Sequence, residues 1–465
     1  MELANDGPAD QHGSSGGGGL ALAAPPNPGA TAVTPPAPPR GAAWRVGGGW
    51  LLTRVLLVLM VTGVLKIAPL DVTTDVSVIY HSWFKVLQTG TFPMDDVTWQ
   101  YPPGAALVIL APGLLPWSYL TSFFVLCGVF DTLAITMLLR TGLRRGRSFA
   151  GAWVWVLGVP LLGPTVYCRY DILVTAIAMT GLLVILRRPV LGGFLLGIGG
   201  LMKLWPLLGL AGTPRGRRTR RSWTAAVGSV ASLAFLLAAG MNGAFQFLTF
   251  QADRGIEVES LGALPLHFAK LFGFWHGAVT MNYGSVEFLG PWVPVISKVA
   301  MGATVAGFGW LLYWRLRARR WQPSTTYDAA LAALLIFTVT SRVISPQYLV
   351  WLVGLAAVCL TVRGTSQRPV AVMVLVATVL TTLEFPMNFG QVVNSTGWGV
   401  TILTARNLTM LAATIVSCQR LWRSTQGPAP AVAEESEAPT EPEPKYPVRP
   451  GIAYEQSLLD DIQHG

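Results

Sequence analysis

Long runs of hydrophobic residues, separated by short polar stretches, dominate the chain between residues 49 and 418. A transmembrane helix needs about 20 mostly apolar residues. Runs of roughly that length occupy residues 49–68, 118–139, 149–165, 169–186, 223–241, 291–314, 327–343, 346–362, 369–386 and 400–418. The pattern predicts an all-α polytopic membrane protein.

Two further apolar segments allow more than one interpretation. Residues 104–116 fit a short span or a helix at the membrane interface, and residues 190–212 fit one span or a tight pair broken around Lys203 to Pro206. Each arm of such a pair would be only about half a span, so neighbouring helices must shelter it. Broken backbone at membrane depth is tolerated where it lines a water-filled cavity, so a break here predicts a polar cavity.

The basic residues decide between these alternatives. They cluster at Arg140 to Arg147, Arg187 to Arg188, Arg215 to Arg221, Arg315 to Arg320, and Arg363 to Arg368. The positive-inside rule makes these loops cytoplasmic, and all of them share one side only if 104–116 is interfacial and 190–212 is a hairpin. This solution gives about 12 spans. It also gives two long extracytoplasmic loops, residues 69–117 and 242–290, in which we expect short interfacial helices.

The composition agrees with a membrane protein: 52% of residues are hydrophobic and 12% are charged. A net charge of +10 would suggest nucleic acid as a partner of a soluble protein, but here the excess lies in loops, where orientation and membrane lipids account for it. Residues 1–44 and 424–465 are predicted to be disordered cytoplasmic tails around one domain, residues 45–423. The four cysteines lack a metal-ligand spacing, so we expect neither a metal site nor a disulfide.

The remaining polar chemistry gathers on the predicted extracytoplasmic side. The first long loop reads DVTTDVSVIYHSWFKVLQTGTFPMDDVTWQYPPG from Asp71 to Gly104. A carboxylate just outside the bilayer, under a lipid-facing cavity, is well placed to act as a general base. The alternative for any one of these acids is an ordinary solvated loop charge.

Four motifs, in this order, resemble glycosyltransferase family 87 of the GT-C superfamily: YPPG at 101–104, RYD at 169–171, MKLWP at 202–206 and SPQYLVW at 345–351. The resemblance covers roughly residues 50–420 and extends to actinobacterial polyprenyl-phosphate-mannose-dependent mannosyltransferases. It implies a GT-C bundle in the cell membrane that acts in cell-envelope biosynthesis. The implied substrates are a polyprenyl-phosphate sugar donor and a lipid or glycan acceptor, and no cofactor is implied.

In that superfamily a first-loop Asp is the catalytic base, and the best matching position is Asp75, with Asp71 as the alternative. A phosphate leaving group requires no general acid, but cations should stabilise it as it departs. The isolated cations on the outward face are Lys203, Arg254 and Arg342, and we expect two of them to contact phosphate. The candidates for contacts to the substrates are Tyr101, Asp96, Glu259, Gln347 and Tyr348.

Structural roles compete with several of these assignments. Arg254 lies beside Asp253 and fits a loop ion pair equally well. Arg169 and Asp171 are expected to pair with each other or with the first loop. Asp131 lies inside a predicted span, where an acid demands a partner, and we assign it a packing role.

Two rival functions remain open from the sequence. A sugar transporter would also have about 12 spans and a broken helix at a polar cavity. The lack of a visible repeat and the concentration of acids outside favour the transferase. Within the transferases, an arabinofuranosyl or glucosyl donor would share the same leaving group.

Overall fold

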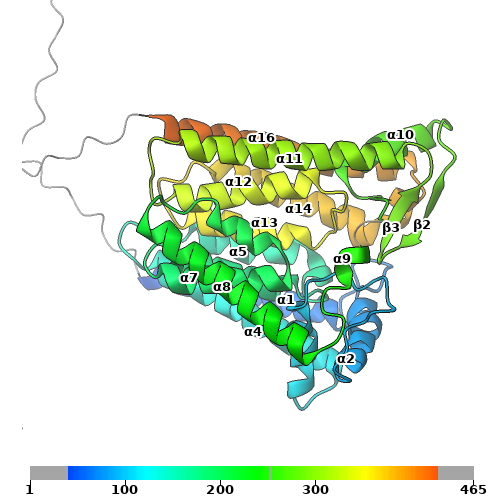
Figure 1. Ribbon diagram of the computed structural model, residues 1–465, viewed down its shortest axis with the longest axis horizontal. Helices are drawn as coiled ribbons and strands as arrows, with labels where there is room; N and C mark the ends of the chain where they lie inside the picture. The colour runs from blue at the N-terminus through cyan, green and yellow to red at the C-terminus, as the bar shows by residue number, and fades with distance from the viewer. Residues whose placement is uncertain (1–39, 251–253, 428–465) are drawn as a thin grey trace, which may run out of the picture.

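The computed structural model describes residues 40–250 and 254–427, and most of this part of the chain is helical. Figure 1 shows the helices running roughly along one direction, so the bundle has two ends. The described chain begins and ends at one of them, and the strands lie at the other with helix α10 (Leu264–Leu271). Helical structure extends a few residues into each predicted tail, and the rest of both tails lies outside the described residues.

Six helices are long and apolar enough to cross a membrane. They are α1 (Arg40–Val61), α4 (Tyr119–Gly142), α8 (Arg217–Gly240), α11 (Val293–Arg317), α14 (Arg368–Thr382) with the following π-turn η6 (Leu383–Met387), and α16 (Gly397–Gln426). Their packing differs: half of the apolar window of α16 is buried in the protein, but only 6% of that of α11. Helix α11 therefore offers most of its surface to lipid.

Shorter apolar helices fill the middle of the bundle. They are α5 (Ala150–Leu161), α6 (Asp171–Ile185), α7 (Pro189–Met202), α12 (Thr325–Thr340) and α13 (Tyr348–Leu360). Nearly every residue of α12 and α13 is buried, as expected for helices that are apolar all round. Because these helices are shorter than a full span, the figure of about 12 spans stays a prediction.

Residues 190–212 fold into the predicted hairpin. Helix α7 ends at Met202, Lys203 is extended, and the 3-10 helix η4 (Trp205–Leu210) turns back along α7. The arms approach closely because Gly200 has no side chain where Leu207 packs. Helices α6, α8 and α12 flank the two arms, so the short hairpin is sheltered as expected.

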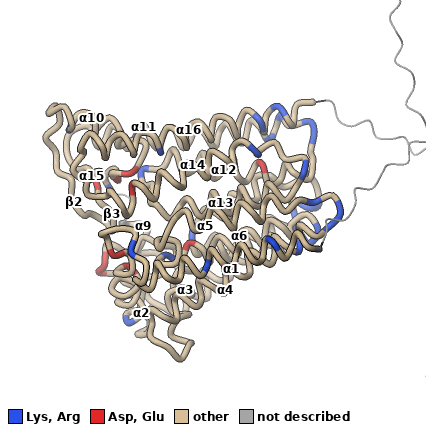
Figure 2. Tube along the Cα trace, turned by 180° about the vertical axis from the view of Figure 1, so that it is seen from behind, with Lys and Arg blue, Asp and Glu red and all other residues tan. Residues whose placement is uncertain are grey.

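The basic loops meet at the end where the described chain begins and ends, which we call the basic end (Figure 2). Backbone hydrogen bonds join the loops: Ser148 N–H donates to the Thr361 carbonyl at 3.1 Å, and Arg319 N–H to the Thr425 carbonyl at 3.0 Å. This clustering agrees with the charge argument for the hairpin. The opposite end is called the cavity end below.

Both long loops lie at the cavity end. The first holds the π-helix η1 (Asp75–Tyr80), α2 (His81–Leu87), α3 (Ala105–Leu110) and the 3-10 helix η2 (Ala111–Leu114). The second holds α9 (Phe247–Phe250), β1 (Ile256–Glu257), the 3-10 helix η5 (Leu261–Ala263), α10, β2 (Ala278–Asn282) and β3 (Ser285–Leu289). Asn242 exchanges backbone hydrogen bonds with Gly90 and Phe92, at 3.1 and 2.9 Å. The two loops are therefore joined. Helix α15 (Phe389–Val393) lies at the same end.

The expectation of helices alone in the second loop is wrong for its strands. They form an antiparallel sheet in the order β1-β3-β2. Between β2 and β3, Tyr283 and Gly284 have φ of 45° and 80°, and two such residues in succession make a tight hairpin turn. A turn of this kind between two five-residue strands overrides any helical tendency. The all-α class holds apart from this sheet.

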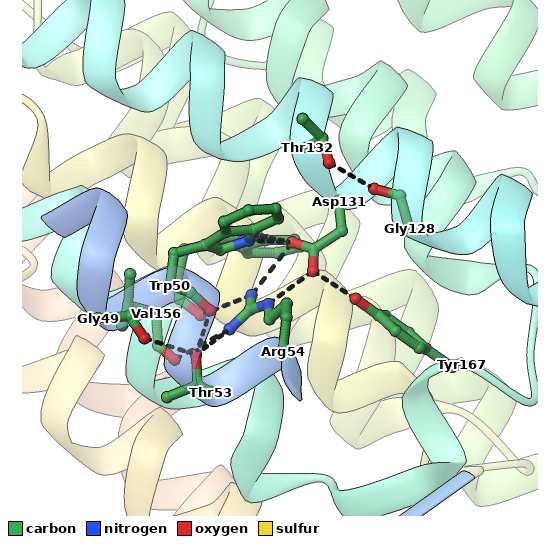
Figure 3. Close-up of polar contacts among 10 residues, drawn as sticks. Gly49, Trp50, Thr53, Arg54, Gly128, Asp131, Thr132, Val156 and Tyr167 are labelled. Carbon is green, nitrogen blue, oxygen red and sulfur yellow. Dashed lines mark hydrogen bonds and ion pairs between the residues drawn. The ribbon is translucent and has the colours of Figure 1, made fainter. Parts of the chain in front are cut away.

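Asp131 of α4 has the charged partner that an acid inside a predicted span requires (Figure 3). Arg54 of α1 donates through Nε to Oδ2 at 2.6 Å and through Nη2 to Oδ1 at 3.1 Å. Trp155 Nε1 at 2.7 Å, Tyr167 Oη at 2.8 Å and Trp50 Nε1 at 3.3 Å also donate to the carboxylate. This cluster joins α1, α4 and α5 and lies outside the cavity described next, which fits the predicted packing role.

Candidate active site

A cavity of about 1270 Å³ occupies the cavity end. Its walls come from both long loops, the hairpin tip, α11 and the break between α12 and α13. The structure brings together nine of the predicted site residues in this lining: Asp71, Asp75, Tyr101, Lys203, Arg254, Glu259, Arg342, Gln347 and Tyr348. Asp96 lies outside the lining.

Asp75 opens η1 and faces the cavity. Its carboxylate pairs with the guanidinium of Arg169, which lies in the turn between the 3-10 helix η3 (Gly163–Val166) and α6. The Asp75 side chain remains 25% exposed, so one carboxylate is both held by a cation and open to a substrate. Of the two pairings expected for Arg169, the structure shows the one with the first loop.

Asp71 and Asp96 both serve local turns. Asp71 Oδ1 accepts hydrogen bonds from the backbone N–H and hydroxyl of Thr73 at 2.9 and 2.8 Å. Asp96 accepts from Trp83 Nε1 at 2.8 Å and from the Thr98 hydroxyl at 2.6 Å. Such side-chain contacts stabilise turns. Asp71 still lines the cavity, whereas the Asp96 carboxylate supports the loop.

Lys203 at the hairpin tip pairs with the buried Asp171. Its Nζ lies 2.7 Å from Asp171 Oδ1, and Trp351 Nε1 donates to the same oxygen at 2.7 Å. The expectation for Asp171 is thus wrong, because the hairpin places Lys203 at the first turn of α6. Four aromatic rings surround the ammonium, with centroids 4.9–5.7 Å away: Tyr101, Tyr170, Tyr348 and Trp351.

Arg254 and Arg342 lie side by side on another wall. Arg254 Nε donates to Glu287 Oε1 at 3.0 Å, so its ion pair is with β3; Asp253 lies outside the described residues. Arg342 Nη1 donates to the Arg254 carbonyl at 3.2 Å. Burial and the neighbouring Arg254 lower the pKa of Arg342. An anion bound between the two guanidiniums would relieve this repulsion.

Lys298 was missed by the sequence analysis. It lies near the start of α11, is exposed and lines the same cavity. The available signal was a lone cation within an apolar helix, where charge is costly without a function or a path to the interface. Lys298 is therefore a further cation of the cavity lining, in addition to Lys203, Arg169 and the arginine pair.

Glu257 lines the same cavity, and no role was assigned to it from the sequence. Its carboxylate accepts hydrogen bonds from the backbone N–H of Ile344 and from the Ser345 hydroxyl, in the break between α12 and α13. Burial raises the pKa of Glu257 from 4.5 to about 7, against the opposing effect of Arg254. A buried acid thus joins Asp71 and Asp75 in the cavity lining.

Glu259 lines the cavity, but its charge partner lies behind it. Arg406 of α16 is 3.4 Å from Glu259 Oε1 and 2.7 Å from Glu384 Oε2. Burial, followed by repulsion from Glu384 and Glu257, raises the pKa of Glu259 well above its usual value. The geometry gives Glu259 a contact with the bundle as well as access to the cavity.

Aromatic rings form the floor of the cavity. Tyr348 stacks on Trp351 with centroids 3.9 Å apart, and Trp351 stacks on Trp205 at 5.4 Å. Tyr101 meets Trp83 edge to face at 5.7 Å. Gln347 is only 8% exposed and occupies the N-cap position of α13 without a capping hydrogen bond from its side chain. An apolar floor with a few directed polar groups is typical of a ligand site.

The fold and the cavity define an integral membrane protein with carboxylates and cations gathered at one end of a helical bundle. In residues 40–250 and 254–427, no group of three His, Cys, Asp or Glu side chains is placed to hold a metal ion. The sequence profile of glycosyltransferase family 87 matches residues 99–346, just over half of the chain, and the chain belongs to this family. Comparisons with curated proteins and with solved structures gave no match.

Family membership settles the class of function. The protein is a glycosyltransferase that uses a sugar donor and an acceptor. The transporter alternative is therefore set aside. The matched region includes the hairpin and both arginines of the cationic wall.

Proposed function

We propose that the protein transfers a hexose from a polyprenyl-phosphate-linked donor to a lipid or glycan acceptor on the extracytoplasmic face of the cell membrane. The observation that carries the proposal is one cavity lined by both a partly exposed carboxylate, Asp75, and the wall formed by Arg254 and Arg342. Mannose is proposed as the sugar on the resemblance described above. An arabinofuranosyl or glucosyl donor would use the same acid and cations.

In the proposed reaction, an acceptor hydroxyl oxygen attacks the anomeric carbon of the donor sugar. The bond from that carbon to the phosphate oxygen breaks, and its electron pair leaves with the polyprenyl phosphate. The hydroxyl proton passes to the Asp75 carboxylate. A carboxylate within reach of the hydroxyl is all that this step requires, because phosphate departs without being protonated.

Cations stabilise the charge that grows on the departing phosphate. The Arg254–Arg342 wall and Lys298 are proposed for this role. Lys203 is proposed to stabilise this charge beside them. Its ammonium already pairs with Asp171, and aromatic rings hold it at the cavity. Charge-assisted contacts to phosphate are about twice as strong as neutral hydrogen bonds.

The lining of the cavity also supports a lipid-linked donor. It continues from the polar wall onto apolar residues of the hairpin and of α11 and α12, namely Leu204, Met301, Val305 and Phe337. Met301 and Val305 are exposed on the lipid-facing helix α11. A polyprenyl chain would therefore find apolar surface next to the cations.

The test compares purified Asp75→Asn, Asp71→Asn and Asp95→Asn, assayed with a polyprenyl-phosphate mannose donor. Asp95 is an exposed acid of the same loop outside the cavity lining, so it is the matched control. Loss of a positioned base costs about 10²–10⁴ in rate, so Asp75→Asn should lose that factor in kcat while Asp95→Asn stays near wild type.

A heavy loss in Asp71→Asn, with Asp75→Asn near wild type, would assign the base to Asp71. Transfer from a nucleotide sugar in place of the polyprenyl-phosphate sugar would refute the proposed donor class.

A further inference from the structure

A second groove lies at the basic end, far from the candidate active site in the fold. It has a volume of about 610 Å³ and runs between α7 and α8. Arg188 and Arg221 stand at its mouth, and Leu191, Phe194, Ala225 and Gly228 are among the residues that line it further in. The proposed reaction uses none of these residues.

Glycines create the groove. Gly193 and Gly197 of α7 lie directly against α8, where any Cβ would collide with Ser222, Ala226 or Ser229. Small residues allow such close helix contact within membranes. Gly228 of α8 behaves differently, because a Cβ there would meet nothing within 4 Å. The helices touch in one place and leave an open apolar channel beside it.

The two arginines at the mouth are available to a ligand. Both side chains are exposed, and neither guanidinium makes a hydrogen bond or ion pair with any residue in the described part of the chain. Arg188 occupies the N-cap position of α7, and Arg221 lies in the second turn of α8. Phe194 and Gly228 lie six and seven residues further along, about 10 Å deeper at 1.5 Å per residue.

This order of groups, two cations at the end of the bundle followed by an apolar channel, matches one ligand chemistry. We propose that the groove binds an anionic phospholipid, with its phosphate between Arg188 and Arg221 and one acyl chain along Ala225 and Gly228. Basic pockets between membrane helices are suited to anionic headgroups. A free phosphate would use the arginines but would leave the channel empty.

The experiment measures lipid binding to the purified full-length protein in detergent by native mass spectrometry. Phosphatidylglycerol is titrated against phosphatidylcholine of the same chain length, with inorganic phosphate as a separate arm. Arg188→Gln/Arg221→Gln removes the cations, and Gly228→Leu fills the channel. The matched controls are Arg145→Gln/Arg220→Gln, which removes two exposed charges from the same end, and Gly309→Leu, which enlarges an exposed, unobstructed glycine of α11.

Each arginine near an anionic headgroup contributes about 1 kcal/mol, so the double Gln variant should raise the Kd for phosphatidylglycerol by about tenfold or more. Gly228→Leu should weaken binding comparably, and the controls should bind like wild type. Equal loss in the Arg145→Gln/Arg220→Gln control would show diffuse charge attraction and overturn the site. Unchanged binding in Gly228→Leu, or equal affinity for phosphatidylcholine, would also overturn it, as would full competition by inorganic phosphate.

Discussion

Arg54 and Asp131 face each other in the interior of the bundle, with 5% and 0% of their side chains exposed. Two charges removed from water are tolerable only when geometry and further hydrogen bonds compensate the lost hydration. Here the carboxylate receives donors from two tryptophans and a tyrosine as well as from the guanidinium. Removing either partner alone would leave the other charge buried and unmatched.

We therefore expect Arg54→Leu to destabilise the protein by about 3–5 kcal/mol. In the double variant Arg54→Leu/Asp131→Asn, the remaining side chain is neutral: its oxygen can still accept from Trp155, and its NH2 group can donate to the Tyr167 hydroxyl. That variant should recover part of the loss. The thermal midpoint in detergent measures both. A double variant no more stable than Arg54→Leu would contradict the proposed charge coupling.

Glu257 should make stability depend on pH. In the folded protein the pKa of the Glu257 carboxyl group is about 7, whereas its usual value is 4.5, so the folded protein keeps this proton up to about pH 7. Its contribution to the free energy of unfolding is therefore complete below pH 4.5 and is lost as the pH rises through 7. Glu257→Gln has no such proton to lose, and its amide oxygen can still accept from Ile344.

The measurement is the thermal midpoint of both proteins from pH 5 to pH 8. We expect the wild type to lose stability relative to Glu257→Gln across this range. Parallel curves would show that Glu257 does not titrate there.

At the scale of elements, two breaks in the helices supply cations to the candidate active site. Lys203 lies where α7 meets η4, and Arg342 lies between α12 and α13. Their surroundings differ, because Lys203 neutralises the buried Asp171, whereas Arg342 lies in the cationic wall. Equal substitutions at the two positions should therefore have different effects.

Arg342→Met should lower kcat/KM for the polyprenyl-phosphate sugar by at least about tenfold, roughly 1.4 kcal/mol of transition-state stabilisation, with little change in thermal midpoint. Lys203→Met should lower the midpoint as well, because it leaves Asp171 unpaired. Arg317→Met at the basic end is the control for loss of a cation. A tenfold loss in that control, or none in Arg342→Met, would contradict phosphate binding by Arg342.

The hairpin and the β-sheet show which elements the sequence can predict. Counting cationic loops was enough to predict that residues 190–212 form a hairpin, broken around Lys203 to Pro206, because membrane orientation constrains the whole chain at once. The strands of the second loop received no such constraint. Their signal was local, the Tyr283–Gly284 turn between alternating residues, and it is weak in a chain dominated by apolar helices.

For the site, the sequence identified the residues better than their partners. Polar residues predicted to face the same side of the membrane all lie at one end of the bundle. Their gathering in one cavity was therefore predictable. Pairings such as Asp75 with Arg169 and Asp171 with Lys203 depend on how helices rotate and pack. Arg54 was missed as the partner of Asp131 for the same reason.

The whole molecule has a basic end and a cavity end (Figure 2). If the basic end is cytoplasmic, exposed cysteines at the cavity end should react with an impermeant thiol reagent in intact cells. Asp95→Cys and Phe274→Cys test that end, and Arg145→Cys and Arg217→Cys test the other. Cys418→Ser provides the background, because the other three native cysteines are buried.

We expect labelling at Asp95→Cys and Phe274→Cys in intact cells, and at all four positions after permeabilisation. Labelling of Arg145→Cys or Arg217→Cys from outside would invert the topology and place the candidate active site in the cytoplasm.

The contact between Trp351 and Asp171 joins residues 180 positions apart. A ribosome adding about 5–20 residues per second needs on the order of 10–40 s to synthesise that interval. Throughout this time Asp171 lies in the nascent chain without its indole partner. Lys203, only 32 residues downstream, is available much earlier to pair with it. The ion pair with Lys203 can therefore neutralise Asp171 in the bilayer while the chain is still being synthesised. The complete aromatic floor forms only after the last third of the protein, which contains Tyr348 and Trp351, has been made.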